Sequence, residues 1–288
     1  MAKSPAHKFG QIIGNVVETA VEPLLEQFAH EQGLYLDKKG RRAARSGRKV
    51  TWTDSHGNRH DLDYVLERGG TAARIGTPVG FIESAWRRYT KHSRNKAQEI
   101  QGAIMSLVET HASVRPFFGA ILAGVFTDGA LGQLRSLGFS VLYFPYDTVI
   151  KAFGRVRVDV RFQEGTPDAE LARRVRAWQK LSEGRRLEVS KSLVRINAEP
   201  VQSFMNSLAM SVTRRVESVR VLPLHGRSVE LVSVDEAITF IKGYDEEDAS
   251  RPVVKYEVQI RYNNGDRIDG QFQNKQSAIE FLHPFQLC

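Results

Sequence analysis

Three carboxylates lie in or beside apolar runs that look suited to the interior of a sheet. Asp61 and Asp63 begin the segment DLDYVLE (residues 61–67), and Glu83 lies inside the segment PVGFIESAW (residues 78–86). An ionised carboxylate is costly to bury unless it has a partner. Carboxylates placed in this way therefore point to a chemical role, and metal binding is the first candidate.

Asp63 and Glu83 can converge at one end of a sheet if their two strands are neighbours. Two or three converging carboxylates form a hard-oxygen site for Mg²⁺, and the bound metal can polarise a phosphoryl oxygen, orient a water molecule and lower its pKa. The spacing also allows a purely structural role, in which Asp63 caps a strand and Glu83 pairs with Arg87 or Arg88.

The charge balance of the 288-residue chain favours a polyanionic partner. Its 41 Lys and Arg against 33 Asp and Glu give a net charge of +8, and such a balance favours nucleic acid or an anionic membrane surface. Residues 38–49 carry seven basic side chains and no acidic one, and residues 86–96 carry five and no acidic one. Either run alone is compatible with a solvated face. The second run directly follows Glu83, where basic side chains would hold the phosphates of a polyanion.

Several classes of protein and site are disfavoured. No apolar run reaches the roughly 18 residues needed to cross a membrane, and the N-terminus lacks the apolar core of a secretion signal. Cys288 is the only cysteine, which excludes a disulfide framework or a cysteine-rich zinc site within one chain. The sequence contains no HExxH, GxxxxGK[ST] or GxSxG motif. We therefore expect a cytoplasmic protein without membrane contact.

Hydrophobic periodicity before residue 160 predicts helices and strands in alternation. The expected elements are a helix over residues 9–34, a hairpin over 48–67, a strand over 78–86, a helix over 93–111, a strand over 117–126, a helix over 128–138, and a strand that leads into a helix over 139–154. Two successive strand–helix–strand crossovers indicate an α/β domain over residues 1–160, with a mixed β-sheet flanked by helices.

The chain after residue 160 shows a different pattern. Basic, largely helical segments are expected over 166–216. Two segments with period-two alternation around turn residues, 219–232 and 256–272, each predict a hairpin followed by a helix. We expect residues 161–288 to combine a basic helical segment with a small α+β unit for DNA recognition or dimer contact, with packing alone as the alternative. Residues 243–252 look like a flexible connector.

The order of these elements resembles that of the PD-(D/E)xK nuclease superfamily, which has the restriction-endonuclease-like fold. Asp63 matches the Asp of the motif, Glu83 matches the (D/E) position, and Glu18 in the first helix matches an additional metal ligand of some members. Gln98, in the helix after the Glu strand, matches a position that is often polar in the family. The resemblance covers roughly residues 8–160 and rests on the order of short motifs along the chain.

The lysine of the motif is absent from its usual position. Two residues after the Glu, where the family has Lys, this chain has Ala85. In the family that lysine stabilises charge and helps position the attacking water, and some members carry the basic residue on a neighbouring element. Lys91 and Lys96 are the candidates here, ahead of Arg87 and Arg88. A member that binds DNA without cutting it is the other possibility.

The resemblance implies a Mg²⁺-dependent endonuclease that hydrolyses phosphodiester bonds of double-stranded DNA, most like a type II restriction enzyme. Asp63 and Glu83 would bind the metal, Glu18 would assist, and Lys96 or Lys91 would replace the motif lysine. Contacts to DNA are expected from the two basic runs: Lys38, Lys39, Arg41, Arg42, Arg87, Arg88 and Arg94. A homodimer on a symmetric site would most simply cut both strands, and a cognate methyltransferase would be a further partner.

Two other functions remain open on the sequence. A non-catalytic DNA-binding or defence-associated protein could retain the nuclease fold, and a scaffold protein could use its basic charge for solubility alone. Metal-dependent cleavage separates the endonuclease from the non-catalytic binder. Salt-sensitive DNA binding separates both of them from the scaffold.

Overall fold

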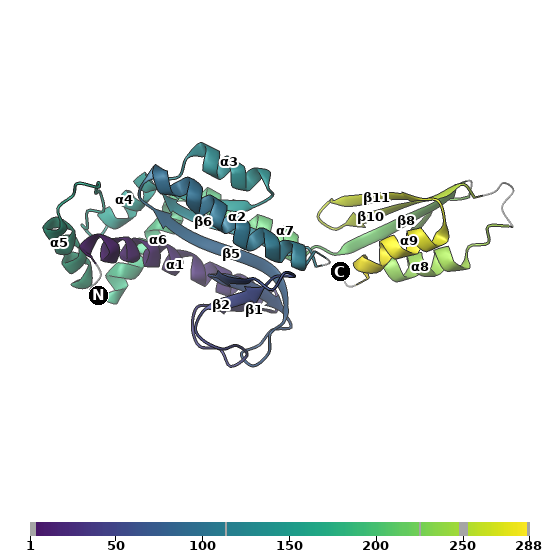
Figure 1. Cartoon of the computed structure of the whole chain (residues 1–288), viewed down its shortest axis with the longest axis horizontal. Helices are drawn as coiled ribbons and strands as arrows, with labels where there is room; N and C mark the ends of the chain where they lie inside the picture. The colour runs from purple at the N-terminus through teal and green to yellow at the C-terminus, as the bar shows by residue number, and fades with distance from the viewer. Residues whose placement is uncertain (1–3, 113, 225, 248–252, 287–288) are drawn as a thin grey trace. The chain divides into compact units, whose positions relative to one another are not determined.

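The computed structural model describes residues 4–112, 114–224, 226–247 and 253–286, and it divides into two compact units (Figure 1). The first unit is Met1–Ala209 and the second is Met210–Cys288. The boundary thus falls inside helix α7 (Ala198–Val212) rather than near residue 160. Residues 248–252 of the expected connector lie outside the described residues.

The first unit is built on a five-stranded mixed sheet flanked by helices. Its strand order is β1-β4-β5-β6-β7, and the strands are β1 (Leu34–Lys38), β4 (Tyr64–Arg68), β5 (Thr77–Arg87), β6 (Phe117–Gly124) and β7 (Ser140–Pro145). β1, β4 and β5 pair antiparallel, whereas β5, β6 and β7 pair parallel. The expected α/β architecture with a mixed sheet is confirmed.

The helices that join the parallel strands turn their apolar positions toward the sheet. α2 (Ser93–Thr110) joins β5 to β6, and α3 (Asp128–Ser136) joins β6 to β7. The buried residues of α2 recur at three-to-four spacing, at Ala97, Ile100, Ile104 and Leu107. They pack in one cluster with residues of the sheet that include Phe81 and Ala85. Because Glu83 alternates with Phe81 and Ala85 along β5, its side chain lies on the face that α2 covers.

Helix α1 (Pro5–Glu31) provides the surface on which the later helices of the first unit pack. It begins at Ser4, whose hydroxyl accepts a hydrogen bond from the His7 backbone, and it continues through Pro23. α5 (Asp168–Gln179) and α6 (Glu183–Ile196) pack against it, and Ser190 Oγ donates a 3.1 Å hydrogen bond to the Val16 carbonyl. The apolar stripes of these two helices need an apolar partner, and α1 supplies it. The helices after residue 160 therefore belong to the first unit. α4 (Tyr146–Gly154) follows β7.

The expected hairpin over residues 48–67 is divided at Asp63. β2 (Val50–Thr53) and β3 (Arg59–Leu62) form a separate two-stranded sheet, whereas the residues after Asp63 form β4 of the central sheet. The Asp54 carboxylate holds the turn between β2 and β3 by accepting hydrogen bonds from the backbone of His56 and Asn58. β1, which the sequence analysis did not predict, pairs with β4. Asp63 thus lies where the chain passes from one sheet to the other.

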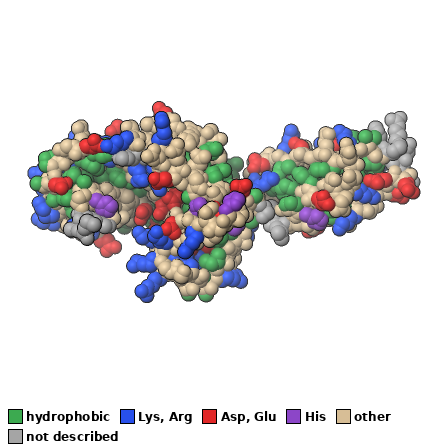
Figure 2. Space-filling model, in the orientation of Figure 1, with side chains coloured by type: hydrophobic (Ala, Val, Ile, Leu, Met, Phe, Trp, Pro, Cys, Tyr) green, Lys and Arg blue, Asp and Glu red, His purple; other side chains and the backbone are tan. Residues whose placement is uncertain are grey.

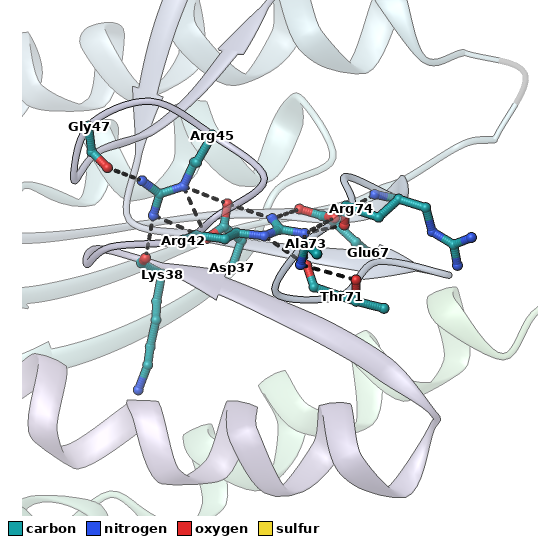
Figure 3. A network of polar contacts seen from close by, with 10 residues as sticks. Asp37, Lys38, Arg42, Arg45, Gly47, Glu67, Thr71, Ala73 and Arg74 are labelled. Carbon is teal, nitrogen blue, oxygen red and sulfur yellow. Dashed lines mark hydrogen bonds and ion pairs between the residues drawn. The ribbon is translucent and has the colours of Figure 1, made fainter.

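A buried ion-pair network ties the loop after β1 to the end of β4 (Figure 3). Arg42 Nη1 lies 2.9 Å from Asp37 and 2.5 Å from Glu67, and all three side chains are 2% exposed or less. Arg42 also donates hydrogen bonds to the carbonyls of Thr71 and Arg74. These acceptors satisfy the guanidinium inside the protein. The structure therefore corrects the expectation that Arg42 contacts DNA.

The second unit is a four-stranded antiparallel sheet with two helices, and it contains both expected hairpins. Its elements are β8 (Val216–Leu224), β9 (Val229–Leu231), α8 (Val234–Gly243), β10 (Lys255–Tyr262), β11 (Arg267–Phe272) and α9 (Lys275–Leu282), with the sheet order β11-β10-β8-β9. Arg220 lies opposite Glu230, Gln259 lies opposite Asp269, and Arg220 and Gln259 lie opposite each other. The unit therefore repeats a strand–strand–helix pattern about a local two-fold axis.

Positive charge is concentrated in the first unit. Ten of the 41 Lys and Arg and twelve of the 33 Asp and Glu lie from residue 210 onward. The first unit therefore holds 31 basic and 21 acidic residues, a net charge of +10, against −2 for the second. A polyanion would be attracted to the first unit. In the described part of the chain, no helix combines the length and apolar character that spanning a membrane requires.

Replacing Arg42 with Met should lower the free energy of unfolding of the first unit by about 3–5 kcal/mol, because the buried Glu67 carboxylate loses its cationic partner. All three tryptophans, Trp52, Trp86 and Trp178, lie in the first unit. The urea midpoint followed by tryptophan fluorescence therefore reports on this unit alone.

A matched control is the exposed ion pair between Arg161 and Asp159. Arg161→Met removes an arginine of the same unit from a solvated pair, so it should cost at most about 1 kcal/mol. Equal losses from Arg42→Met and Arg161→Met would contradict a stabilising role for the buried network.

Candidate active site

Asp63 and Glu83 lie opposite each other on neighbouring strands. The pairing of β4 with β5 places Tyr64 opposite Ile82, and one further step along the same register brings Asp63 level with Glu83. The pairing of β1 with β4 brings Lys39 level with Asp63 in the same way. The order across the sheet is therefore Lys39, Asp63 and Glu83, and side chains directly opposite each other share a face.

Reciprocal hydrogen bonds hold the two carboxylates at this level. Asp63 Oδ2 accepts a 2.8 Å hydrogen bond from the Ser84 backbone N–H, and the Glu83 carboxylate accepts one from the backbone of Asp63. Each carboxylate retains further lone pairs that can bind another ligand. The sheet backbone thus positions both groups without neutralising them.

Burial and mutual repulsion disfavour the charged forms of this pair. Only 7% of Glu83 is exposed, and burial, followed by the charge of Asp63, raises the pKa of Glu83 to about 8. Burial also raises the pKa of Asp63, against the opposing effects of the Ser84 hydrogen bond and of Lys96 and Lys39. A cation bound between the carboxylates would relieve this repulsion, as a metal ion does in a carboxylate site.

Glu18 on α1 is the third carboxylate of this electrostatic group. Partial burial, followed by the charge of Asp63, raises the pKa of Glu18, while Lys39 acts to lower it. Lys39 therefore acts on both Glu18 and Asp63.

Lys38 neutralises the rest of the acidic face of α1. Helical spacing places Glu18, Glu22 and Glu26 on one face, and Lys38 forms ion pairs with Glu22 and Glu26. Lys38, expected among the DNA contacts, is thereby engaged within the protein. Figure 2 shows acidic side chains gathered in the middle of the first unit, with Lys and Arg side chains beside and below them.

Lys96 supplies positive charge beside Glu83. Its Nζ lies 3.6 Å from Glu83 Oε2 and 3.6 Å from Oε2 of Glu99 on the same helix. Ala85, at the position of the motif lysine, is 5% exposed and packs in the same cluster as Ala97. A lysine at position 85 would have to place its charge in that apolar cluster. Lys96, on the adjacent helix, reaches the carboxylate from the rim of the core instead.

Lys91 and Arg88 are engaged with the segment that follows α4. Lys91 forms an ion pair with Glu164. Arg88 Nε donates a 2.6 Å hydrogen bond to the Phe162 carbonyl, and its guanidinium lies 4.3 Å from the centre of the Tyr146 ring. The pairing of Glu83 with an arginine, which the spacing allowed, is replaced by the pair with Lys96.

The remaining expected DNA contacts lie at or near the surface. Lys39, Arg41 and Arg94 are exposed. Arg87 is half-buried and donates a hydrogen bond to the Trp86 carbonyl. These four cations remain the members of the expected set that a polyanion can approach.

Sequence reasoning missed the place of Lys39 beside the carboxylates. It put Lys39 among the DNA contacts because β1 was not predicted. The alternation of Leu34 and Leu36 with polar neighbours is the signal for this strand. Of its five residues, Leu34 fell in the expected helix over 9–34 and Lys38 fell in the basic run over 38–49, so too few residues remained to indicate a strand.

The donor set fits a hard divalent cation. Within the described residues, no three His, Cys, Asp or Glu side chains are already arranged as a metal-binding group. The candidates Asp63, Glu83 and Glu18 are all carboxylates, which suit Mg²⁺ better than a soft metal. All three have raised pKa values, which a nearby divalent cation would reverse. Completing the site would require Glu18 to move toward the pair.

Comparisons with known proteins leave the family of the chain open. No protein-family model matches it, and no curated protein matches it. Among solved structures, a chain titled "Crystal Structure of Protein of Unknown Function AF1548" is 11% identical, with a TM-score of 0.30, over 66% of this chain and 98% of that one. A likeness of this size says nothing about function.

In EDTA, the first unit should become less stable as the pH rises from about 5 to about 9. The folded state raises the pKa of Glu83 from 4.5 to about 8, so it binds the proton more tightly than the unfolded state does. This contribution is complete below pH 4.5 and is lost as the pH rises through 8. Glu83→Gln should remove roughly 2–4 kcal/mol of that pH dependence.

The measurement is the urea midpoint by tryptophan fluorescence at pH 5, 7 and 9. Glu109→Gln is the control, since Glu109 is an exposed carboxylate on the same helix as Lys96, and it should keep the wild-type dependence on pH. If Glu83→Gln and the wild type lost stability equally across this range, the Glu83 carboxyl would not titrate in the way described.

Proposed function

We propose that the chain is a Mg²⁺-dependent endonuclease with a restriction-endonuclease-like core, which hydrolyses phosphodiester bonds of double-stranded DNA. One observation carries the proposal: Asp63 and Glu83 lie level on adjacent strands, with Lys96 3.6 Å from Glu83. Phosphodiester hydrolysis by a metal enzyme needs carboxylates that hold a hard cation and a protein cation that binds the phosphate. This site offers both kinds of group.

The residues divide the chemistry between them. Asp63 and Glu83 would hold Mg²⁺ with help from Glu18, and the bound ion would supply Lewis-acid activation of the phosphoryl oxygen and of water. Lys96 would stabilise the negative charge that builds at the scissile phosphate, an interaction that is stronger in the transition state than in the ground state. Its anchor on α2 suits this role because a helix holds the ammonium group more firmly than a loop. Lys39 would bind a neighbouring phosphate oxygen from the side of β1.

The charge distribution supports a division of labour between the two units. The first unit carries the net positive charge, so it would bind the DNA backbone as well as cut it. The second unit would serve sequence recognition or dimer contact, because a dimer on a two-fold symmetric site cuts both strands. An enzyme most like a type II restriction endonuclease would work in the cytoplasm beside a cognate methyltransferase.

The second candidate function is DNA binding without cleavage. Ala85 at the position of the motif lysine favours it, since a site without a positioned cation loses charge stabilisation at the phosphate. Such a protein would bind DNA in a salt-sensitive manner and would leave plasmid DNA intact in the presence of Mg²⁺ or Mn²⁺.

Asp63→Ala and Glu83→Ala should each abolish cutting of plasmid and phage DNA in Mg²⁺, because each removes a metal ligand. Both variants should retain most of the DNA affinity measured in EDTA, and EDTA should stop cutting by the wild type. Glu109→Ala, which removes an exposed carboxylate from α2, should cut at the wild-type rate. A wild-type protein that binds these DNAs but leaves them intact with Mg²⁺ and with Mn²⁺ would favour the second candidate.

Lys96→Ala should lower the single-turnover cleavage rate by about 10²-fold or more, with a much smaller effect on DNA affinity, because it removes one preorganised charge-stabilising group. Lys91→Ala is the matched control, since Lys91 pairs with Glu164, and it should cut close to the wild-type rate. If Lys96→Ala cut as fast as the wild type, the role of the motif lysine would fall to another cation, with Lys39 the first to test.

A further inference from the structure

The loop between β1 and β2, residues 39–49, is fixed in place by its own arginines. Arg42 anchors the loop through its buried pairs with Asp37 and Glu67. Arg45 donates hydrogen bonds to Asp37 and to the carbonyls of Lys38 and Gly47 (Figure 3). Two of the seven basic residues of the run are thus used to order the loop.

The backbone closes the loop at its base, where the Gly40 N–H donates a 2.8 Å hydrogen bond to the Arg48 carbonyl. Ordering a loop of this length has a conformational entropy cost. A basic run that served only as a solvated face would gain nothing from such bracing. The remaining cations are therefore presented on a preorganised surface, which binds a ligand with less loss of entropy than a mobile loop.

An open hollow of about 500 Å³ lies between this loop and the β2–β3 hairpin. Arg48 and Lys49 line it from the loop, and Arg59 and Asp61 line it from β3. The only carboxylate among the lining residues is already engaged, because Asp61 accepts from Lys49 at 2.5 Å and from the Thr51 hydroxyl at 2.6 Å. Two guanidinium groups, of Arg48 and Arg59, therefore give the hollow a net positive charge.

We propose that this hollow, which we call the arginine seat (Arg48, Lys49, Thr51 and Arg59), binds a phosphate of the DNA backbone away from the scissile bond. Guanidinium groups suit this ligand because their paired N–H donors match two phosphate oxygens. This inference rests on the proposed function, since it takes the ligand of the site to be duplex DNA.

The position of the seat along the chain fits a backbone contact. Arg59 begins β3, and Asp63 directly follows the last residue of this strand, four residues after Arg59. At about 3.3 Å per residue this separation is roughly 13 Å. Phosphates follow one another at about 3.4 Å along the axis of each DNA strand. The seat would therefore hold the backbone some three to four nucleotides from the phosphate that Lys96 contacts, and it would fix the register of the duplex over the carboxylates.

The test is DNA binding by the variant Arg48→Gln/Arg59→Gln in EDTA, measured by fluorescence anisotropy of a labelled duplex between 50 and 200 mM salt. The affinity should fall by about 10-fold or more, and the slope of log K against log salt should become shallower by about 0.9, because the variant loses one phosphate contact. At subsaturating DNA in Mg²⁺, the cleavage rate of the variant should fall together with its affinity, because the seat contributes to binding the duplex.

The matched control is Arg173→Gln/Arg195→Gln, which removes two exposed arginines from α5 and α6 of the same unit. It makes the same change in net charge and should leave the salt slope close to that of the wild type. Equal effects of the two double variants would overturn the seat, because the loss would then follow from net charge alone. Circular dichroism and the urea midpoint establish that both variants are folded.

Further arms identify the ligand and separate this inference from the proposed function. Inorganic phosphate that binds the wild type but not the seat variant, while both bind the duplex with equal affinity, would assign the hollow to small anions and overturn the proposal. Tighter, seat-dependent binding of duplex RNA would also overturn it. Cleavage by the wild type, together with a salt slope in the seat variant equal to that of the wild type, would reject the seat and leave the proposed endonuclease activity standing. A shallower salt slope in the seat variant, together with no cleavage by the wild type, would support the seat and reject the endonuclease.

Discussion

Asp63 and Glu83 face each other because β4 pairs with β5 in one register, and a shift by a single residue would turn one of them to the opposite face of the sheet. Apolar burial holds that register: Val65, Leu66, Phe81 and Ile82 on the two strands are fully buried. Burial of each such side chain contributes about 1.5–3 kcal/mol to the free energy of unfolding. Their sum exceeds the few kcal/mol by which two buried carboxylates repel each other, so the sheet can keep the carboxylates close.

Glu67 in β4 and Asp63 just before β4 are two acidic positions on the same face, and they differ in how completely they are satisfied. Glu67, near one end, meets the guanidinium of Arg42 through two hydrogen bonds of 2.5 and 2.9 Å and also accepts from the Gly76 backbone at 2.7 Å. Asp63, just before the other end, meets a backbone N–H and a second carboxylate. The first arrangement is complete without any ligand. The second has unused oxygens and two like charges close together, and these conditions favour the binding of a cation.

Much of the first unit could be predicted from periodicity, because the buried residues of α2 recur at helical spacing and β5 and β6 are short apolar runs. The convergence of Asp63 and Glu83 followed from taking their strands as neighbours. Lys96 was among the predicted replacements for the motif lysine, and only its contact with Glu83 separates it from Lys91, which pairs with Glu164.

Other features depend on tertiary contacts that local sequence does not encode. The split of the hairpin at Asp63 depends on β1, a strand too short to stand out. The burial of Arg42 depends on its pairs with Asp37 and with Glu67, and Glu67 lies 25 residues later in the sequence, so the run of cations reads as surface. The helices after residue 160 pair with α1, more than a hundred residues earlier, and no local signal records that packing.

The two-fold pattern of the second unit leaves its sheet with two outer strands of different design. β9 has only three residues, and β11 exposes Arg267, Asp269 and Gln271 in alternation. Short outer strands and alternating charges both resist the addition of a further strand. The sheet is thereby protected against edge-to-edge growth, so self-association through this unit has to use a face or a helix. A continuous sheet running through two copies of the chain is the geometry that the unit disfavours.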